Sequence, residues 1–275
     1  MPDLSQSKIE AVYTLLKGEP GTRKSTQALS YPKPQYWFSW DMKMNALLLP
    51  MMKWGISPKE IKFDNYTDWN KPKAKLEEFQ LNCPFKTLVF DSITSGADAI
   101  NRQTLKLKQG TSTRSGADAG KLIAGIPVNT IEDFNAEDSA LKELVALTKD
   151  INNYHKVNII LIAHIVQKEM KSPDGKTHMA RILVTAGKSI AQKIPAYCDE
   201  AYHFNIKSGI DTSQGGQYAL KTVHTGDDYA RTMLDLPEEI VFGSDQLYDK
   251  WIRPAIDKLN ERLTQPIQPT NKLEL

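Results

Sequence analysis

A chain of 275 residues is long enough for one large α/β domain or for two small domains. The formal net charge of +2 excludes recognition of a polyanion through overall charge, so any nucleic-acid site must come from local clusters of basic residues. The cysteines, Cys83 and Cys198, are far apart and lack metal-ligand spacing, which excludes a disulfide framework and indicates a reducing compartment.

The sequence carries no membrane signal. Its first residues, Met-Pro-Asp-Leu-Ser-Gln-Ser-Lys, lack the basic and then apolar pattern of a secretory signal. No apolar run approaches the length that a bilayer requires. We therefore expect a soluble, cytoplasmic protein without a membrane partner.

Apolar, strand-like runs alternate with helical patterns along the chain. We expect strands at 11–17, 35–40, 87–90, 157–163, 200–206 and 217–223, and helices at 25–30, 41–54, 69–81, 137–153, 188–196 and 248–263. This order predicts an α/β fold: a mostly parallel, twisted sheet with helices on both faces and antiparallel strands near the C-terminal side. A single domain would span residues 1–263, and the Pro- and Gln-rich tail, 264–275, is expected to be disordered.

Two long polar segments interrupt this alternation, at about 101–135 and 166–181, and both are predicted to be loops. Their basic residues are Arg102, Lys106, Lys108, Arg114 and Lys121 in the first, and Lys168, Lys171, Lys176 and Arg181 in the second. Such residues can make salt-dependent contacts to nucleic-acid phosphates, or they can simply be solvated. Aromatic residues are sparse in both segments, so no stacking platform for bases is visible.

A phosphate-binding loop follows the first expected strand. The pattern G-x-x-x-x-G-K-[ST] is met at every position except the second glycine, where Arg23 stands. The residues expected to hold a nucleotide are Gly18, Glu19, Pro20, Gly21, Thr22, Arg23, Lys24, Ser25 and Thr26. The alternative is an ordinary surface turn between a strand and a helix, but the strand before the loop and the helix after it are the context that the motif demands.

Each polar residue of this loop has an expected task. Lys24 would reach the β- and γ-phosphates, and Ser25 would place its hydroxyl on Mg²⁺. Gly18 and Gly21 supply backbone conformations that most residues avoid. Arg23 would be strained if its position requires a positive φ, and its side chain would either point outward or lie over the phosphates as an added cation.

Three further polar residues stand where expected strands end. Asp91 closes the strand 87–90 and is placed to act near a metal, or else to cap a turn with the residue that follows it. Asp41 follows the strand 35–40, where it would polarise the attacking water or cap the next helix. His164 follows the strand 157–163, where it would sense the γ-phosphate or be a satisfied polar side chain.

Taken in chain order, these parts resemble the RecA-like ATPases among the P-loop NTPases. The resemblance covers roughly residues 12–237 and is closest to phage-encoded RecA-like proteins that act in recombination and single-strand annealing. It implies that Lys24 is the phosphate lysine and that Ser25 and Asp91 are linked to the metal. Asp41 stands where the family usually has a catalytic glutamate, and His164 stands where it has a polar sensor.

The resemblance also extends to later segments. Residues 166–181 match the position of a mobile DNA-contacting loop, and the stretch 185–189 matches a glycine-containing start of the next helix. Arg231 loosely matches a cation that reaches the γ-phosphate of a neighbouring subunit, and a solvated arginine is the alternative.

The resemblance implies ATP and Mg²⁺ as cofactors and single-stranded DNA as a partner in recombination, annealing or replication. It further implies a homo-oligomer, either a ring or a filament, and a single-strand-binding or annealing protein as a second partner, in the host-cell cytoplasm. Because of Arg23, we expect ATP hydrolysis that is slow or stimulated by DNA. The alternative is a nucleotide-binding regulatory or assembly protein with weak or no hydrolysis, and a small-molecule kinase is disfavoured because no Arg-rich lid is found.

Overall fold

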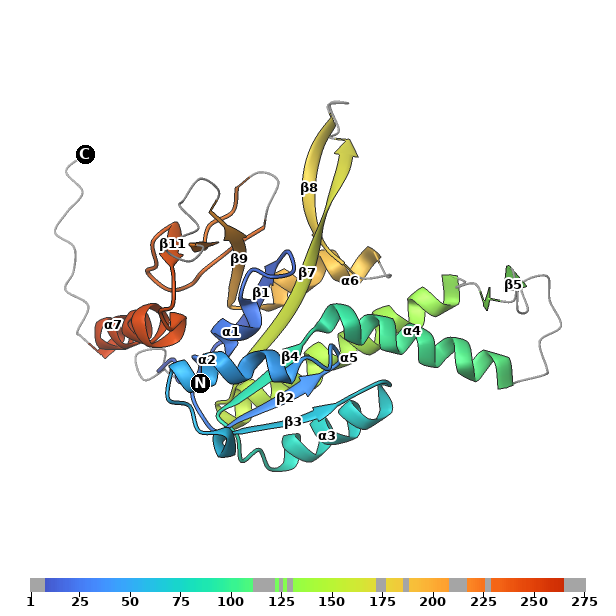
Figure 1. Cartoon of the computed structure of the whole chain (residues 1–275), viewed down its shortest axis with the longest axis horizontal. Helices are drawn as coiled ribbons and strands as arrows, with labels where there is room; N and C mark the ends of the chain where they lie inside the picture. The colour runs from blue at the N-terminus through green and yellow to red at the C-terminus, as the bar shows by residue number, and fades with distance from the viewer. Residues whose placement is uncertain are drawn as a thin grey trace, which may run out of the picture.

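Figure 1 shows the computed structural model, which describes residues 8–110, 122–123, 126–127, 131–171, 177–184, 188–207, 217–225 and 229–264. Within these residues, one nine-stranded sheet has the order β11-β10-β9-β1-β7-β4-β2-β3, and β8 pairs with β7 outside this path. The strands are β1 (Tyr13–Gly18), β2 (Gln35–Ser39), β3 (Ile61–Asn65), β4 (Thr87–Asp91), β7 (Asn158–Lys171), β8 (Thr177–Leu183), β9 (Glu200–Ile206), β10 (Tyr218–Lys221) and β11 (Glu239–Phe242). A separate two-stranded piece joins β5 (Leu122–Ile123) to β6 (Ile126–Pro127).

The centre of the sheet is parallel and its C-terminal side is antiparallel. Strands β3, β2, β4, β7, β1 and β9 pair in parallel from one neighbour to the next. Strands β9, β10 and β11 pair antiparallel, as do β7 and β8. The predicted fold class, a mostly parallel α/β sheet with antiparallel strands near the C-terminal side, is confirmed.

Helices cover both faces of the sheet because alternate strand residues are apolar on each side (Figure 1). One face packs against α3 (Asn70–Leu81), α4 (Ile93–Gly110), α5 (Ile131–His155) and α6 (Lys188–Tyr197). The other face packs against α1 (Lys24–Ala28), η2 (Met44–Leu47), α2 (Leu48–Lys53), η5 (Tyr248–Ile252) and α7 (Arg253–Thr264). A short helix, η3 (Pro58–Glu60), leads into β3.

The carboxyl ends of the parallel strands meet at one edge of the sheet. Gly18 at the end of β1 is in register with His164 on β7 and with Phe204 on β9. Asp91 at the end of β4 is in register with Ser39 on β2. In open α/β sheets this edge is where ligands bind, and it gathers the polar residues that the sequence placed after its strands.

Aromatic packing fixes the strand ends that carry the carboxylates. Phe38 and Phe90 stack with ring centroids 4.5 Å apart, and Trp40 packs on Phe90 at 6.4 Å. Trp40 directly precedes Asp41 and Phe90 directly precedes Asp91, so these buried rings anchor the backbone from which both carboxylates project.

Several local expectations were wrong. The helix expected at 41–54 is two shorter helices, η2 and α2. The segment 101–135 is not a loop at its ends, because α4 continues to Gly110 and α5 begins at Ile131. Residues 166–171 and 177–181 are not a mobile loop but paired antiparallel strands: β7 and β8 pair from Ile165↔Leu183 to Lys171↔Thr177. Val166, Gln167, Glu169 and Thr177 are exposed, and exposed strand residues show no period-2 hydrophobic pattern, which explains why this sequence resembled a loop.

Other expectations fall outside the described residues. These are the middle of the first polar segment, residues 172–176 of the second, the stretch 185–187 and the tail 265–275. No helix among the described residues is both long enough and apolar enough to cross a membrane.

Candidate nucleotide-binding site

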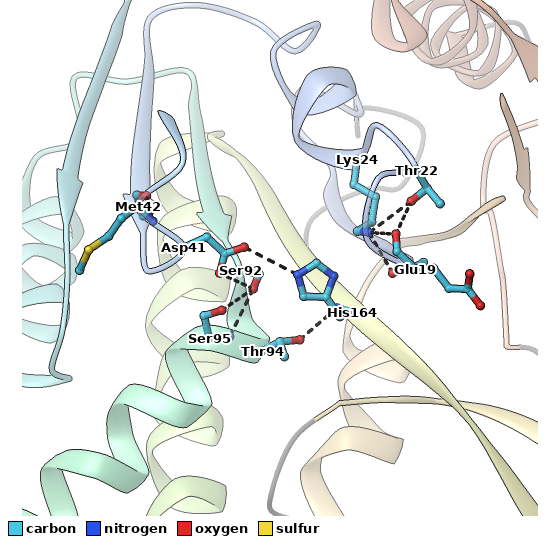
Figure 2. A network of polar contacts seen from close by, with 11 residues as sticks. Glu19, Thr22, Lys24, Asp41, Met42, Ser92, Thr94, Ser95 and His164 are labelled. Atoms are coloured by element: carbon cyan, nitrogen blue, oxygen red, sulfur yellow. Dashed lines mark hydrogen bonds and ion pairs between the residues drawn. The ribbon is translucent and has the colours of Figure 1, made fainter. Parts of the chain in front are cut away.

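The expected phosphate-binding loop joins the end of β1 to the start of α1, as Figure 2 shows in part. Gly18 is required by space, because a Cβ there would lie 2.5 Å from the carbonyl oxygen of Phe204. Gly21 is required by conformation, because its φ of +82° lies in the region that favours glycine. Gly18 of the motif and the additional glycine at position 21 therefore each have a structural reason, and the loop from Gly18 to Thr26 is continuous with the first turn of α1.

Lys24 lies inside the curl of this loop and is almost fully buried. Its Nζ donates to the carbonyl oxygens of Gly18 at 2.8 Å and Glu19 at 2.7 Å, and to Thr22 Oγ1 at 3.2 Å. Burial lowers the pKa of Lys24 to about 8, and the charges of Asp91, Asp41 and Glu19 oppose that shift. The loop thus holds a cation where phosphate oxygens would be recognised.

Asp91 lies beside this cation at the carboxyl end of β4 and is buried. Burial, followed by the charge of Asp41, raises the pKa of Asp91 to about 6. A hydrogen bond from Ser25 and the charges of His164 and Lys24 act in the opposite direction. Asp91 and Ser25 are therefore in contact, and their expected role at a metal stays a prediction.

Ser25 and Asp91 are the residues that would hold Mg²⁺. A hydroxyl and a buried carboxylate are hard oxygen ligands, and such a pair leaves positions for water and phosphate oxygens, which Mg²⁺ prefers. Burial and the neighbouring charge of Asp41 raise the pKa of Asp91, and a divalent cation at this position would offset both effects. The residues present therefore fit the cation, which would neutralise phosphate charge when bound.

Asp41 and His164 form the second half of the site. His164 Nε2 lies 3.7 Å from Asp41 Oδ2, and Ser92 Oγ donates to Asp41 Oδ1 at 3.2 Å. Burial raises the pKa of Asp41, but hydrogen bonds from His164, Ser95 and Ser92 outweigh burial and lower the pKa to about 2. Asp41 is therefore an anion at neutral pH.

Figure 2 shows the imidazole ring of His164 between Asp41 and the loop that carries Glu19, Thr22 and Lys24. The backbone at His164 is held by Thr94, because the His164 N–H donates to Thr94 Oγ1 at 3.0 Å. Its Nδ1 is buried and has no hydrogen-bond partner among the described residues. An imidazole with one nitrogen on Asp41 and the other unsatisfied is well placed to meet a ligand in the loop.

Arg23 points away from this site. Its backbone has φ 64° and ψ 22°, a left-handed conformation that is unfavourable for a residue with a Cβ. Its Nη1 donates to the carbonyl of Gly243 at 2.9 Å, and its guanidinium carbon lies 4.3 Å from the ring centroid of Tyr218. Of the two orientations that the sequence left open, the outward one is observed.

Arg231 is not brought to the loop of its own chain. Its backbone exchanges hydrogen bonds with Ala201 at 2.9 Å and 3.0 Å. Ala201 lies near the amino end of β9, three residues before Phe204, which pairs with Gly18. The expected action of Arg231 on a neighbouring subunit therefore stays a prediction.

Sequence reasoning missed several residues that support the site. Ser92, Thr94 and Ser95 orient Asp41 and His164, and the run of hydroxyl residues directly after Asp91 was the signal that would have found them. Tyr218 receives the guanidinium of Arg23, and nothing in its local sequence marks that role.

This fold and this site define a P-loop nucleotide-binding domain. A mostly parallel sheet carries the phosphate loop after β1, an aspartate after β4 and polar residues after β2 and within β7. This order of parts is the one that the sequence assignment to the P-loop NTPases predicted.

Comparison with known proteins gives the family. The chain belongs to the AAA domain family, whose model matches residues 10–232. No curated protein matches its sequence. Among solved structures, the chain is similar to the crystal structure of a KaiC-like protein from the hyperthermophilic archaeon Pyrococcus horikoshii OT3, with 13% identity, a TM-score of 0.44, and coverage of 84% of this chain and 89% of that one.

Proposed function

We propose that this protein hydrolyses ATP with Mg²⁺ and that single-stranded DNA, bound at the β7–β8 hairpin, controls the rate. The observation that carries the proposal is the continuity of β7. The strand holds His164 beside Asp41 and then runs on, without a break, to Lys171 in the hairpin. A ligand that moves the hairpin would therefore move His164.

The hairpin has the position and composition for a nucleic acid. It rises from the sheet beside α6, at the edge where the nucleotide loop lies (Figure 1). Its sequence includes Lys168, Lys171 and Arg181. Lysine and arginine contacts to phosphates give binding that is strong at low salt and weakly dependent on sequence.

The hydrolytic step depends on Asp41. Asp41 is ionised and accepts hydrogen bonds, so it can orient the attacking water. A carboxylate with a pKa of about 2 is a poor proton acceptor, because general-base catalysis is most efficient when the pKa lies near the working pH. This combination favours slow basal hydrolysis that rises when DNA repositions His164.

We further propose that the protein works as a homo-oligomer, a ring or a filament, with a role in recombination, annealing or replication of the kind found in phages. Arg231 would then act on the nucleotide of a neighbouring subunit, and a single-strand-binding or annealing protein would be a second partner. The exposure of Arg231 is consistent with that role.

A second function is favoured by one surface. Met42, Leu48, Leu49 and Met52 are 52%, 52%, 60% and 78% exposed on the segment that follows Asp41. Exposed apolar side chains in one segment are typical of protein-binding surfaces. They support a nucleotide-binding regulatory or assembly protein whose hydrolysis is weak or absent and whose partner is another protein.

One experiment separates the two functions. ATP turnover is measured with and without single-stranded DNA, for the unsubstituted chain and for Lys24→Ala, and DNA binding is followed by fluorescence anisotropy at two salt concentrations. We expect DNA-stimulated turnover that Lys24→Ala abolishes. ATP binding without any turnover, and without DNA binding at low salt, would contradict the first function and favour the second.

A further inference from the structure

Arg23 connects the nucleotide loop to the antiparallel end of the sheet. Its guanidinium carbon lies 4.3 Å from the ring centroid of Tyr218 on β10, and its Nη1 donates to the Gly243 carbonyl at 2.9 Å, directly after β11. Both contacts come from the residue that stands in place of the usual glycine. They hold its side chain outside the loop rather than over the phosphates.

The two groups that contact Arg23, the Tyr218 ring and the Gly243 carbonyl, are fixed by further contacts. Tyr218 pairs with Phe242 across the β10–β11 ladder, and their rings stack with centroids 6.1 Å apart. The chain after Gly243 is bound to α1 and to the end of α2: Gln27 Nε2 donates to the Asp245 carbonyl at 2.9 Å, and Trp54 Nε1 donates to the Ser244 carbonyl at 2.9 Å. The Arg23 side chain therefore contacts a part of the fold, β10, β11 and residues 243–245, that is itself bound to α1 and α2.

The backbone conformation of Arg23 explains why its side chain needs these contacts. A glycine would adopt φ 64° without strain, whereas the Cβ of an arginine makes this conformation unfavourable. Such a conformation persists when the surrounding contacts fix it. Lys24 and Ser25 come directly after this turn, so a change in the turn would move the phosphate lysine and the metal-linked hydroxyl together.

We propose that Arg23 is a positioning residue that braces the nucleotide loop against Tyr218 and Gly243, so that the β10–β11 end of the sheet sets the affinity for ATP. The inference rests on the proposed binding of ATP. Arg23 acts on affinity and not on the chemical step, because its guanidinium is bound to Gly243 and Tyr218, whereas Asp41 and His164 contact each other.

The test compares variants that remove the brace with variants that keep it. Arg23→Gly retains the left-handed turn and removes both side-chain contacts of Arg23. Tyr218→Ala removes the aromatic ring that Arg23 contacts, whereas Tyr218→Phe keeps an aromatic ring at that position. The matched control is Arg253→Ala, since Arg253 also lies over a tyrosine ring, that of Tyr248, at 5.5 Å. Calorimetry gives the Kd for ATP with Mg²⁺, steady-state turnover gives KM and kcat, and thermal unfolding without nucleotide gives Tm.

We expect Arg23→Gly, which removes both the cation–π interaction and the hydrogen bond to Gly243, to weaken ATP binding by about tenfold. Tyr218→Ala removes only the ring contact and should weaken ATP binding by less. The double variant should bind ATP no more weakly than Arg23→Gly, because Arg23→Gly already removes the ring contact. Tyr218→Phe and Arg253→Ala should bind ATP as the unsubstituted chain does, and kcat should change by less than about twofold in all variants that hydrolyse ATP.

Several results would overturn the inference. One is that Arg23→Gly binds ATP as tightly as the unsubstituted chain, and another is that the losses of affinity add in the double variant. A higher kcat in Arg23→Gly, or a lower Tm in a variant whose Kd for ATP is unchanged, would also overturn it. These outcomes are distinct from failure of the proposed function, which would show as no ATP binding by the unsubstituted chain and would remove the basis of the inference as well.

Discussion

Asp41 and His164 meet across an intervening strand. Asp41 follows β2 and His164 lies on β7, and β4 separates these two strands in the sheet. Their Oδ2 and Nε2 atoms are nevertheless 3.7 Å apart, because both side chains extend over the end of β4 beside Asp91. The pair therefore links Asp41, the carboxylate proposed to orient the attacking water, to the strand that continues into the hairpin.

Loss of this pair should slow the chemical step. Asp41→Asn keeps the size of the side chain and removes its charge, so we expect kcat for ATP to fall by about 100-fold or more while KM changes little. His164→Ala should have a similar effect, and the double variant should be no slower than Asp41→Asn. Single-turnover hydrolysis measures each rate, and Asp235→Asn, an exposed carboxylate paired with Lys258, is the control.

Strictly additive losses would contradict this prediction, because two residues that act as a unit do not contribute independently. An unchanged rate in Asp41→Asn would remove Asp41 from the reaction and favour the function without hydrolysis.

Removal of the Asp91 charge should stabilise the nucleotide-free protein. The pKa of Asp91 is raised from 3.8 to about 6, first by burial and then by Asp41. Between these values the folded state binds more protons than the unfolded state, so stability contributed by this group falls as pH rises from about 4 to about 6. Asp91→Asn should therefore melt higher than the unsubstituted chain at pH 7.5, by about 2–4 °C per kcal/mol gained.

The same substitution should abolish the stabilisation by MgATP, because the metal loses its carboxylate. In the unsubstituted chain, binding of MgATP should weaken as pH falls through about 6, where Asp91 takes up a proton. Thermal unfolding with and without MgATP at pH 5.5 and 7.5 tests both statements. A lower Tm in Asp91→Asn at pH 7.5 would show that the carboxylate stabilises the fold instead.

The sequence predicted which polar residues come together better than it predicted the surrounding segments. Asp91, Asp41 and His164 lie with the phosphate loop at one edge of the sheet, because each comes at the end of a buried apolar run and parallel runs end together. The order of buried strands was visible for the same reason: residues enclosed on both faces form continuous apolar runs.

What the sequence did not predict depends on contacts far along the chain. The direction of the Arg23 side chain is set by Tyr218 and Gly243, which lie about 200 residues away in the sequence. The hairpin was missed because its strands extend beyond the sheet and have no hydrophobic alternation. The edge strand β3 was missed too, since only Ile61 among its residues is buried.

The two loop glycines should respond differently to alanine. At position 18 a Cβ would lie 2.5 Å from a backbone oxygen, so the adjoining strand must shift. At position 21 nothing lies within 4 Å, and the cost is only the left-handed conformation, about 1–2 kcal/mol. We expect Gly18→Ala to lower Tm more than Gly21→Ala and to lose ATP binding. Equal effects in unfolding and calorimetry would contradict the steric argument.

The hairpin lysines should control DNA binding and leave the basal reaction unchanged. Lys168→Gln and Lys171→Gln remove charge from the β7 arm beyond the nucleotide site. We expect weaker binding to single-stranded DNA at low salt. The slope of log K against log salt should shrink by about 0.7 for each phosphate that the hairpin no longer neutralises.

The matched control replaces Lys250 and Lys258, which lie on η5 and α7 and pair with Asp245 and Asp235 at exposed positions. That double variant carries the same change in net charge, so an equal loss of DNA binding would show that general electrostatics, and not the hairpin, binds the strand. If the hairpin variant binds DNA normally but loses DNA stimulation of turnover, β7 transmits the signal without holding the phosphates, because His164 and the hairpin share one strand.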